Sequence, residues 1–490
     1  MLHIGIDIGT QGTKCVVWDK ESGNIISRGA FSYGLLPTTK EGAAEQHPST
    51  WIEATIAAVR QALESLNNRG TISSIGVSGQ QHGMVLLDEF GEVVRPAKLW
   101  CDVESSSEAK QLSEALDYTL VPSFTATKLL WTKNNEPHNW ARARHLLLPS
   151  SYINYWLTGV IAMEAGDASG TGLLDVEKKS WDKKAADLVD EKVWNMLPTL
   201  REPSQAVGAL RQEVAQTLGL TDTVVVSAGC GDNACSALGV GITRPGQLVM
   251  SLGTSATLFG MSSTPVLDPS GTVAPFCDAT GAWLPLICLL NCTAVLQEVC
   301  NLTGKGHEEL TELSKTTSSP GCNGVTFLTY LSGERTPNWP HAAGTVLGIK
   351  HGVLTPGLLY RAAMEGITNA LLAGFHGMQK LGMGDAYDIC LVGGGAKNKL
   401  WGKIIADAFQ LPVRVPEETE TAALGAALQG AACVETIPVS EFISRQKQLI
   451  SPADVIRPDS SLKEIYAESF TRHQAHSVAL FSNMQGCKHK

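Results

Sequence analysis

The pattern Gly-Thr-x-x-Thr occurs twice in this 490-residue chain, and each copy interrupts an apolar run. The first copy begins at Gly9, inside residues 4–18, and the second begins at Gly253, after residues 247–252. An apolar run on each side of a short glycine turn predicts a β-hairpin. The copies lie 244 positions apart, about half the chain, so the repeat predicts two related domains. We expect them to span residues 1–242 and 243–490.

Each of these turns could hold a phosphate group. Glycine lets the main chain approach an anion closely, and amide groups and threonine hydroxyls can donate hydrogen bonds to phosphate oxygens. Either turn alone would be an ordinary hairpin, but the recurrence favours a shared polyphosphate. The candidate residues are Gly9, Thr10, Gln11, Gly12 and Thr13 in the first turn, and Gly253, Thr254 and Ser255 in the second.

One charged residue lies in the first predicted strand. Asp7 stands among Ile4, Ile6 and Ile8, two positions before Gly9. A carboxylate in such a strand is costly unless it has a cation or hydrogen-bond donors. A metal-bound nucleotide at the turn would supply them.

A second acidic residue stands at a predicted strand-to-helix turn. The β-branched run 224–227 ends in a glycine-rich turn, and the small apolar residues 234–241 predict a helix. Asp232 lies between the two. Because the start of a helix favours negative charge, we expect an ionised carboxylate that could accept a proton. The alternative is that Asp232 only caps the helix.

The twelve cysteines show no Cys-x-x-Cys pair and no Cys/His cluster with zinc-ligand spacing, so we expect reduced thiols. Cys230 and Cys235 flank Asp232, but no adjacent His or Lys would lower a thiol pKa. We therefore expect both to serve as small buried side chains.

The charge of the chain excludes some classes of partner. The formal net charge is −10, the pI is about 5.7, and no basic run is present, so nothing indicates binding to nucleic acid or to an anionic membrane surface. The chain enters a strand without a basic-then-apolar leader, and no apolar run approaches ~18 residues. We expect a cytoplasmic enzyme. The sequence favours neither a monomer nor an oligomer.

Polar loops after two predicted strands are candidates for ligand contacts. Residues 51–66 predict a helix that stops at 67–70, and the strand 72–77 then ends in a loop with Gln81 and His82. Ligands collect at the carboxyl ends of strands in open α/β sheets. A second predicted strand, 95–102, ends with Trp100 and Asp102, and an indole can cover the apolar face of a sugar. The alternatives are a turn role for His82 and a cap for the helix 105–115 at Asp102. A further loop is predicted at 167–172.

A glycine-rich connection follows a strand in the second half. The short strand 389–392 ends at Gly393-Gly394-Gly395-Ala396-Lys397-Asn398, and a helix is predicted from 400 to 409. Three glycines in a row allow a flat ligand to approach closely, and the helix presents its positive end there. A nucleotide base is the obvious candidate, because a plain connection would not need three glycines. A small-residue helix at 419–432 is expected near this loop.

These motifs together resemble the FGGY carbohydrate kinases of the actin-like ATPase superfamily. IGIDIGTQGTK, SLGTSAT and LVGGGAKN resemble the two phosphate loops and the adenosine loop of the family, and FTATKLLW and GTVLGI followed by RAAMEG resemble its two signatures. The resemblance implies an α/β fold of two actin-like (ribonuclease H-like) domains with a central cleft. It also implies binding of ATP and Mg²⁺, with the sugar on the N-terminal domain and the nucleotide on the C-terminal domain.

The elements SGQQHG, RPAKLW-x-D and YLSGERTP are similar to those of family members that phosphorylate the 5-hydroxyl of D-xylulose. The resemblance implies that Asp232 is the general base and that Asp7 orients magnesium-bound water. It assigns the sugar to Gln81, His82, Trp100, Asp102, Asp232 and Asn233, the phosphates to the two turns with Lys14, and the adenosine to Gly394, Gly395, Ala396 and Asn398. The open alternatives are another FGGY kinase, for D-ribulose or a related ketose or polyol, and a non-catalytic sensor. Retention of Asp7 and Asp232 argues against a sensor.

Overall fold

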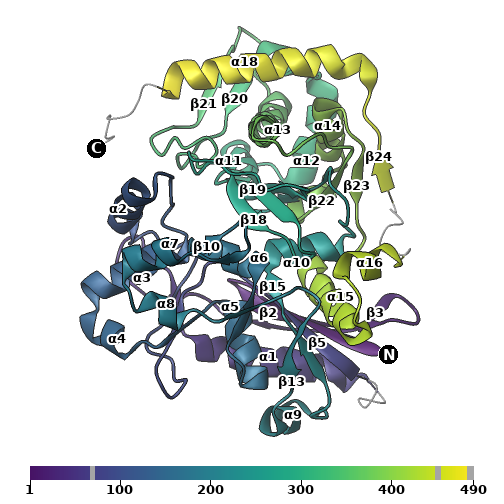
Figure 1. Ribbon diagram of the computed structural model, residues 1–490. Coiled ribbons are helices and arrows are strands. Elements are labelled where there is room, and N and C mark those ends of the chain that lie inside the picture. Colours follow the sequence, from purple (N-terminus) through teal and green to yellow (C-terminus); the bar gives the residue numbers. More distant parts are fainter. Residues whose placement is uncertain (67–71, 447–453, 483–490) are drawn as a thin grey trace.

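The computed structural model describes residues 1–66, 72–446 and 454–482, and it contains two α/β halves built on separate sheets (Figure 1). The predicted helix stop at 67–70 lies outside the described residues. Within these ranges no helix is both long and apolar enough to span a membrane.

The first sheet has the strand order β13-β14-β5-β1-β2-β3, and β15 also pairs with β5. β1, β2 and β3 form an antiparallel meander, whereas β5 lies parallel to β1 and to β14. The predicted hairpin around Gly9 is therefore confirmed. The strands are β1 (Leu2–Ile8), β2 (Gly12–Asp19), β3 (Asn24–Ser32), β5 (Ile72–Gly79), β13 (Ala206–Ala209), β14 (Val225–Ser227) and β15 (Cys230–Gly231).

The second sheet repeats this arrangement in the order β18-β19-β17-β16-β22-β23-β24. β16, β17 and β19 form the antiparallel meander, and β22 lies parallel to β16 and to β23. The turn at Gly253 thus occupies the same place in its sheet as the turn at Gly9, and the predicted internal repeat is confirmed. The strands are β16 (Gln247–Leu252), β17 (Ala256–Gly260), β18 (Ala274–Cys277), β19 (Trp283–Leu289), β22 (Asp388–Val392), β23 (Val413–Val415) and β24 (Asp454–Ile456).

Two-stranded pieces extend both halves. They pair β4 (Glu45–Gln46) with β7 (Ala97–Lys98), β6 (Val85–Leu87) with β8 (His145–Leu147), β9 (Ala162–Glu164) with β12 (Thr199–Arg201), β10 (Leu174–Asp175) with β11 (Ser180–Trp181), and β20 (Thr326–Leu328) with β21 (Thr345–Leu347). The predicted strand 95–102 is therefore wrong in length, because only Ala97 and Lys98 pair with a neighbouring strand.

The helices follow the predicted apolar spacing, with ends set by local caps. α1 begins at Pro48, three residues before the predicted start, because proline suits the first turn and the His47 side chain accepts from the Ser49 amide. The helices are α1 (Pro48–Glu64), α2 (Ser106–Leu116), α3 (Thr125–Asn135), α4 (Pro137–Arg142), α5 (Pro149–Thr158), α6 (Ala165–Ala168), α7 (Lys183–Val189), α8 (Val193–Met196), α9 (Gln212–Leu218), α10 (Asp232–Gly239), α11 (Thr293–Thr303), α12 (His307–Thr317), α13 (Pro356–Lys380), α14 (Lys399–Phe409), α15 (Thr421–Glu435), α16 (Val439–Ser444) and α18 (Lys463–Phe481).

Residues 167–171 are helical, so the loop prediction for 167–172 is wrong except at Gly172, which ends the 3₁₀ turn in the left-handed region. The helical residues belong to α6 and the 3₁₀ turn η2 (Ser169–Thr171). The Glu164 carboxylate accepts hydrogen bonds from the amides of Gly166 and Asp167, so a buried cap starts the helix.

Helix α15 lies on the first sheet although it comes late in the chain (Figure 1). It packs on β1, β5 and α10, instead of beside the glycine loop at 393–398 as expected. Glycines make this approach possible: a Cβ atom at Gly5 would lie 1.8 Å from the Ala423 oxygen, and one at Gly425 would lie 1.7 Å from the Cys235 oxygen. The sequence shows these glycines but does not indicate which main-chain atoms they pack against.

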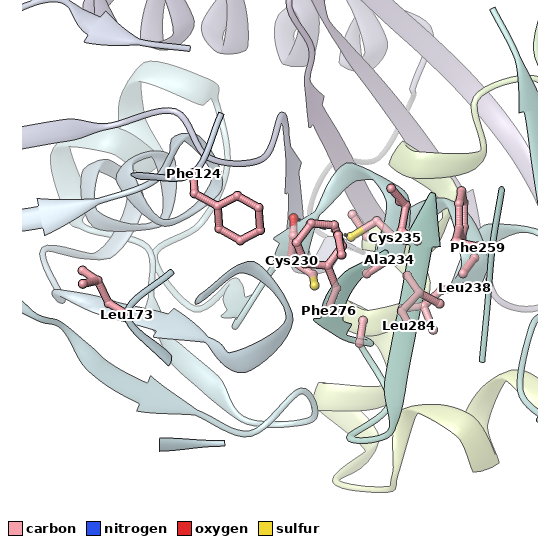
Figure 2. Packing of buried hydrophobic residues seen from close by; sticks show 14 of the residues in the cluster. Phe124, Leu173, Cys230, Ala234, Cys235, Leu238, Phe259, Phe276 and Leu284 are labelled. Atoms are coloured by element: carbon pink, nitrogen blue, oxygen red, sulfur yellow. Dashed lines mark hydrogen bonds between the residues drawn. The ribbon is translucent and has the colours of Figure 1, made fainter. Parts of the chain in front are cut away.

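A continuous apolar core joins the two halves. Figure 2 shows Ala234, Cys235 and Leu238 of α10 packed with Phe259 and Leu284 of the second sheet. The start of α10 therefore lies at the junction between the halves. Cys230 and Cys235 are both fully buried in this cluster, as predicted.

Candidate active site

Asp232 is the first residue of α10, directly after β15 has paired with the end of β5. The alternative that Asp232 only caps the helix is wrong, because the N-cap residue is Gly231. One of its carboxylate oxygens accepts hydrogen bonds from the Asn233 amide at 2.8 Å and from Asn233 Nδ2 at 3.0 Å. These bonds orient the carboxyl group at the start of the helix. Both of these bonds go to the same oxygen, Oδ1.

The pKa of Asp232 differs from our expectation. Burial, followed by the nearby Asp7 carboxylate, raises the pKa of Asp232 to about 7. The hydrogen bond from the Asn233 amide acts in the opposite direction but is outweighed. Near neutral pH the helix start therefore does not by itself keep this carboxylate ionised, contrary to our expectation. A carboxylate with a pKa near 7 suits proton acceptance.

Asp7 lies on β1, opposite Ser78 of β5. Ser78 Oγ donates a hydrogen bond of 2.8 Å to one oxygen of Asp7. Burial raises the pKa of Asp7, whereas the Ser78 bond and the charge of Lys14 lower it. One carboxylate oxygen beside a phosphate-type turn fits a contact with water bound to Mg²⁺, which keeps several of its waters in proteins.

The predicted sugar-contacting residues Gln81, Asn233 and Asp232 form a connected polar row. Asn233 Nδ2 donates to Gln81 Oε1 at 3.1 Å as well as to Asp232. A Cβ atom added at Gly231 would lie 2.6 Å from the Gln81 side chain, so the turn before Asp232 packs directly on Gln81. The structure thus brings together residues that are about 150 positions apart in the chain.

His82 follows this row and is held as a neutral imidazole. Its Nδ1 donates to the Gly170 carbonyl at 2.6 Å, which leaves Nε2 as an acceptor. Its ring lies 5.0 Å from that of Phe124 and 5.5 Å from that of Phe276, so it bridges the two halves. Burial, then the charge of Lys128, lowers the pKa of His82 to about 3.

Trp100 and Asp102 have different surroundings. The Trp100 indole N–H donates to the hydroxyl of Thr10 in the first phosphate turn. Asp102 is fully buried and accepts from Lys98 Nζ at 3.1 Å and from the Ala44 amide at 2.9 Å. The alternative that Asp102 caps α2 is wrong, because the N-cap residue is Ser105.

The first phosphate turn is fixed by its own hydrogen bonds. The Gly9 amide donates to the Gly12 carbonyl at 3.0 Å, and the Tyr33 hydroxyl donates to the Gly9 carbonyl at 2.8 Å. Thr13 is buried, whereas Gln11 is exposed at the tip. Lys14 pairs with Glu420 at 2.7 Å, so its charge is already balanced. Within this turn Gln11 is therefore exposed, and Gly9, Thr10 and Gly12 are half-buried.

The second turn is tied to helix α11. The Gly253 carbonyl accepts from the Thr293 amide at 3.0 Å and from its hydroxyl at 2.7 Å. The Gly253 amide donates to the Ser255 carbonyl at 3.0 Å, and Thr254 is exposed at the tip. Both turns therefore present an exposed polar tip on a fixed base.

The glycine-rich loop after β22 forms one wall of a cavity of about 800 Å³. Asn398 caps α14 by accepting from the Trp401 amide at 3.2 Å and donates to Thr311 Oγ1 at 3.0 Å. A Cβ atom at Gly394 would meet nothing within 4 Å, whereas one at Gly395 would lie 2.7 Å from Leu252. Of these two glycines, only Gly394 is open to a ligand. The lining residues include Thr293, Leu296, His307, Thr311, Tyr360, Gly394, Gly395 and Asn398.

Two buried lysines near the site were not predicted from the sequence as site residues. Lys98 lies within 3.3 Å of Glu45 and also pairs with Asp102 and Glu104. Those three acids are the only cluster of metal-capable side chains in the described ranges, and the lysine ammonium supplies the positive charge there. Lys128 is also fully buried. Its position within FTATKLLW was the only available signal.

The cysteines have packing roles. The Cys230 thiol donates to the Glu164 carboxylate at 3.0 Å, and burial raises the pKa of Cys230 well above its usual value. Eleven of the twelve cysteines are described, and all eleven are free thiols. Cys487 lies outside the described residues.

Comparisons with known proteins agree in both sequence and structure. Models of the N- and C-terminal domains of the FGGY family of carbohydrate kinases match residues 2–239 and 248–433. A "Xylulose kinase" of Haemophilus influenzae is 36% identical over 98% of this chain and 100% of its own length. A "Xylulose kinase" of Streptomyces coelicolor is 37% identical over 88% of this chain and 87% of its own. The crystal structure of a "xyloylose kinase" from Brucella ovis is 32% identical and has a TM-score of 0.91, covering 98% of this chain and 99% of that one.

Proposed function

Because this chain belongs to the FGGY family of carbohydrate kinases, we propose that it transfers the γ-phosphoryl group of ATP to the 5-hydroxyl of D-xylulose. Relatives named xylulose kinase align over nearly its whole length, which supports this substrate. The observation that carries the chemistry is the position of Asp232. Its carboxyl group is bonded to Asn233, which also bonds Gln81, and the charge of Asp7 raises its pKa, at the start of a helix where the two halves meet.

Asp232 is the general base of this proposal. Its carboxylate accepts the proton of the 5-hydroxyl while the hydroxyl oxygen forms a bond to the γ-phosphorus and ADP leaves. Burial and Asp7 place the pKa of Asp232 near 7, so the group exchanges a proton easily near neutral pH. The hydrogen bonds from Asn233 hold one oxygen and direct the other to the substrate.

The sugar contacts come from the polar row. Gln81, His82 and Asn233 offer an amide, an imidazole acceptor and a second amide to the hydroxyls of the ketose. Trp100 supplies an apolar face for the sugar. Asp102 is fully buried and bonded to Lys98, so its contribution to sugar binding is indirect, through Lys98. The matched polar groups would reject epimers that leave them unpaired.

The phosphates and the base use equivalent parts of the two sheets. The turns after β1 and β16 would hold the phosphate groups, and Asp7 would accept hydrogen bonds from the water shell of Mg²⁺. The magnesium ion would neutralise charge on the transferring group. The cavity behind Gly394 and Asn398 receives the adenosine. Closure of the halves around the substrates would exclude water from the phosphoryl group.

We also infer a cytoplasmic location, because eleven free cysteines are typical of a reducing compartment.

An assay of ADP release with a panel of sugars tests the proposal. D-xylulose should give the highest kcat/KM among D-xylulose, D-ribulose, L-ribulose, L-fuculose and glycerol, and epimers should lose about 1–3 kcal/mol for each mispaired polar group. A preference for D-ribulose or glycerol would contradict the substrate but keep the family. Absence of ADP release with every sugar would favour the sensor.

A further inference from the structure

His82 adopts a backbone conformation that its residue type rarely takes. Its φ angle is +66°, in the left-handed region, although it has a side chain. Such residues persist where their surroundings determine the conformation, and they cluster at ligand sites. The question is therefore which groups hold His82 in place.

Two donors on α3 converge on the main-chain carbonyl of His82. Lys128 Nζ donates at 3.1 Å and Thr125 Oγ1 donates at 3.2 Å. Both side chains are fully buried. Lys128 also donates to the Ser123 carbonyl, so its ammonium group lies between two main-chain oxygens.

Lys128 occupies this position without a close acidic partner. Within the described ranges no carboxylate lies within 4.0 Å of its ammonium group, because Lys98 takes the nearby Glu45, Asp102 and Glu104. A buried cation held only by carbonyls is costly. Burial accordingly lowers the pKa of Lys128 to about 7. An apolar side chain at this position would lower the free energy of unfolding less than a buried lysine does, so the lysine indicates a functional requirement.

The remaining contacts of His82 fix its ring. Nδ1 donates to the Gly170 carbonyl. A Cβ atom added at Gly170 would lie 2.7 Å from Nδ1, so the main chain at Gly170 packs directly against the ring. Phe124 and Phe276 lie beside the ring. With Nδ1 engaged, Nε2 is the one polar atom of the His82 ring left for a substrate.

We propose that Lys128, assisted by Thr125, is a positioning residue that holds His82 in its left-handed conformation and so directs Nε2 toward a hydroxyl of the sugar. Lys128 itself does not touch the substrate in this arrangement. The inference rests on the proposed function, because it assigns the sugar to His82. It deepens that function because it names Lys128 as the residue by which helix α3 affects the affinity for the sugar.

The proposal predicts a specific pattern of binding. Lys128→Met keeps the length of the side chain but removes its N–H donors. Calorimetric titration with D-xylulose should show a Kd increased about tenfold or more, as expected when a buried carbonyl loses a charged donor. The KM for ATP should stay within about twofold of the wild-type value, because the adenosine cavity is formed by the other half. Lys133→Met is the matched control, because Lys133 lies on the same helix but contacts Val189 and Asp190 instead.

A double-mutant cycle with His82→Ala separates positioning from general damage. If Lys128 acts through His82, adding Lys128→Met to His82→Ala should change the Kd for D-xylulose by less than about twofold. An equal loss in both backgrounds, or no loss in either, overturns the proposal. If Lys128→Met does not fold, the same cycle with Thr125→Val decides, because it removes the second donor and leaves the lysine in place.

The cycle also distinguishes this inference from the proposed function. If the wild-type protein phosphorylates another ketose and does not bind D-xylulose, the proposed substrate fails. The same four proteins titrated with that other ketose then still decide the role of Lys128.

Discussion

The indole N–H of Trp100 donates a hydrogen bond to the hydroxyl of Thr10 at 3.0 Å. The Thr10 hydroxyl in turn donates to Gln80 Oε1 at 2.9 Å. A residue expected to cover the sugar is thus bonded to the first phosphate turn, and that turn is bonded to the loop that carries Gln81 and His82. The residues proposed to bind the sugar and those proposed to bind phosphate therefore share one hydrogen-bonded unit.

The first prediction concerns this unit. Trp100→Phe keeps an aromatic face for the sugar but removes the bond to Thr10. The KM for ATP should rise about fivefold, the effect of roughly 1 kcal/mol for one lost hydrogen bond, together with the KM for D-xylulose. Steady-state kinetics with each substrate varied would measure both. A change confined to D-xylulose would mean that Trp100 acts on the sugar alone.

Asp232→Asn should separate catalysis from structure. Asparagine has nearly the same size as aspartate and keeps an oxygen that can accept from the Asn233 amide, so the fold should persist, but it cannot accept the proton. Turnover at saturating ATP and D-xylulose should fall about 10²–10⁴-fold. A variant with normal kcat would remove Asp232 from the mechanism and leave it a structural role at the start of α10.

The pKa of Asp232 predicts how rate and stability depend on pH. Because the base must be deprotonated, kcat/KM for D-xylulose should rise as the pH increases through about 7 and then level off. The folded pKa lies above the ordinary value of 3.8, so the stability associated with this group is present below pH 4 and is lost as the pH rises through 7. The Tm of Asp232→Asn should therefore exceed that of the wild type at pH 8 by more than at pH 5. An equal difference at both values would contradict the raised pKa.

Asp7→Ala should affect the nucleotide and not the sugar. Removal of the carboxylate should lower kcat and increase the magnesium concentration needed for half-maximal activity, because one oxygen partner of the hydrated ion is lost. The Kd for D-xylulose measured by calorimetry should stay near the wild-type value. Unchanged magnesium dependence in a folded variant would assign Asp7 a structural role.

Gly425→Ala tests the close packing of α15. The added methyl group would lie 1.7 Å from the Cys235 oxygen, so the helix must move, at a cost of roughly 1–3 kcal/mol or more. Thermal unfolding should show a clear decrease in Tm. The control is Gly377→Ala on α13, where the methyl group meets nothing within 4 Å and should stabilise the helix by roughly 0.5–1 kcal/mol. Equal effects of the two changes would mean that α15 tolerates displacement.

The sequence predicted the repeated parts of the fold well, because they depend on local signals. The hairpins at Gly9 and Gly253 and the strand-to-helix turn at Asp232 each combine an apolar run with glycine. The loop predicted at 167–172 was wrong for 167–171, because a buried cap from Glu164 starts a helical segment that runs through Gly170, and only Gly172 keeps a turn conformation.

The site was predicted as a set of residues but not as a network. Nothing local indicates that Lys98 would meet Glu45, or that Lys128 would reach the carbonyl of His82, since each contact joins segments about 45–55 positions apart. The pKa of Asp232 depends on Asp7, which is more than 200 positions away. A pKa of this kind depends on burial and on contacts between distant segments, and the periodicity of apolar residues in the sequence does not reveal either.

The late position of α15 also matters for synthesis of the protein. Strands β1 and β5 are made early, but the helix that covers them ends at Glu435. The ribosome must therefore add more than 350 residues after β5 before that face of the first sheet can be covered. During that interval Gly5 and Gly76, which lie against α15 in the finished protein, remain open to other contacts. The first sheet is thus synthesised early, but it is completed only late, when α15 covers it.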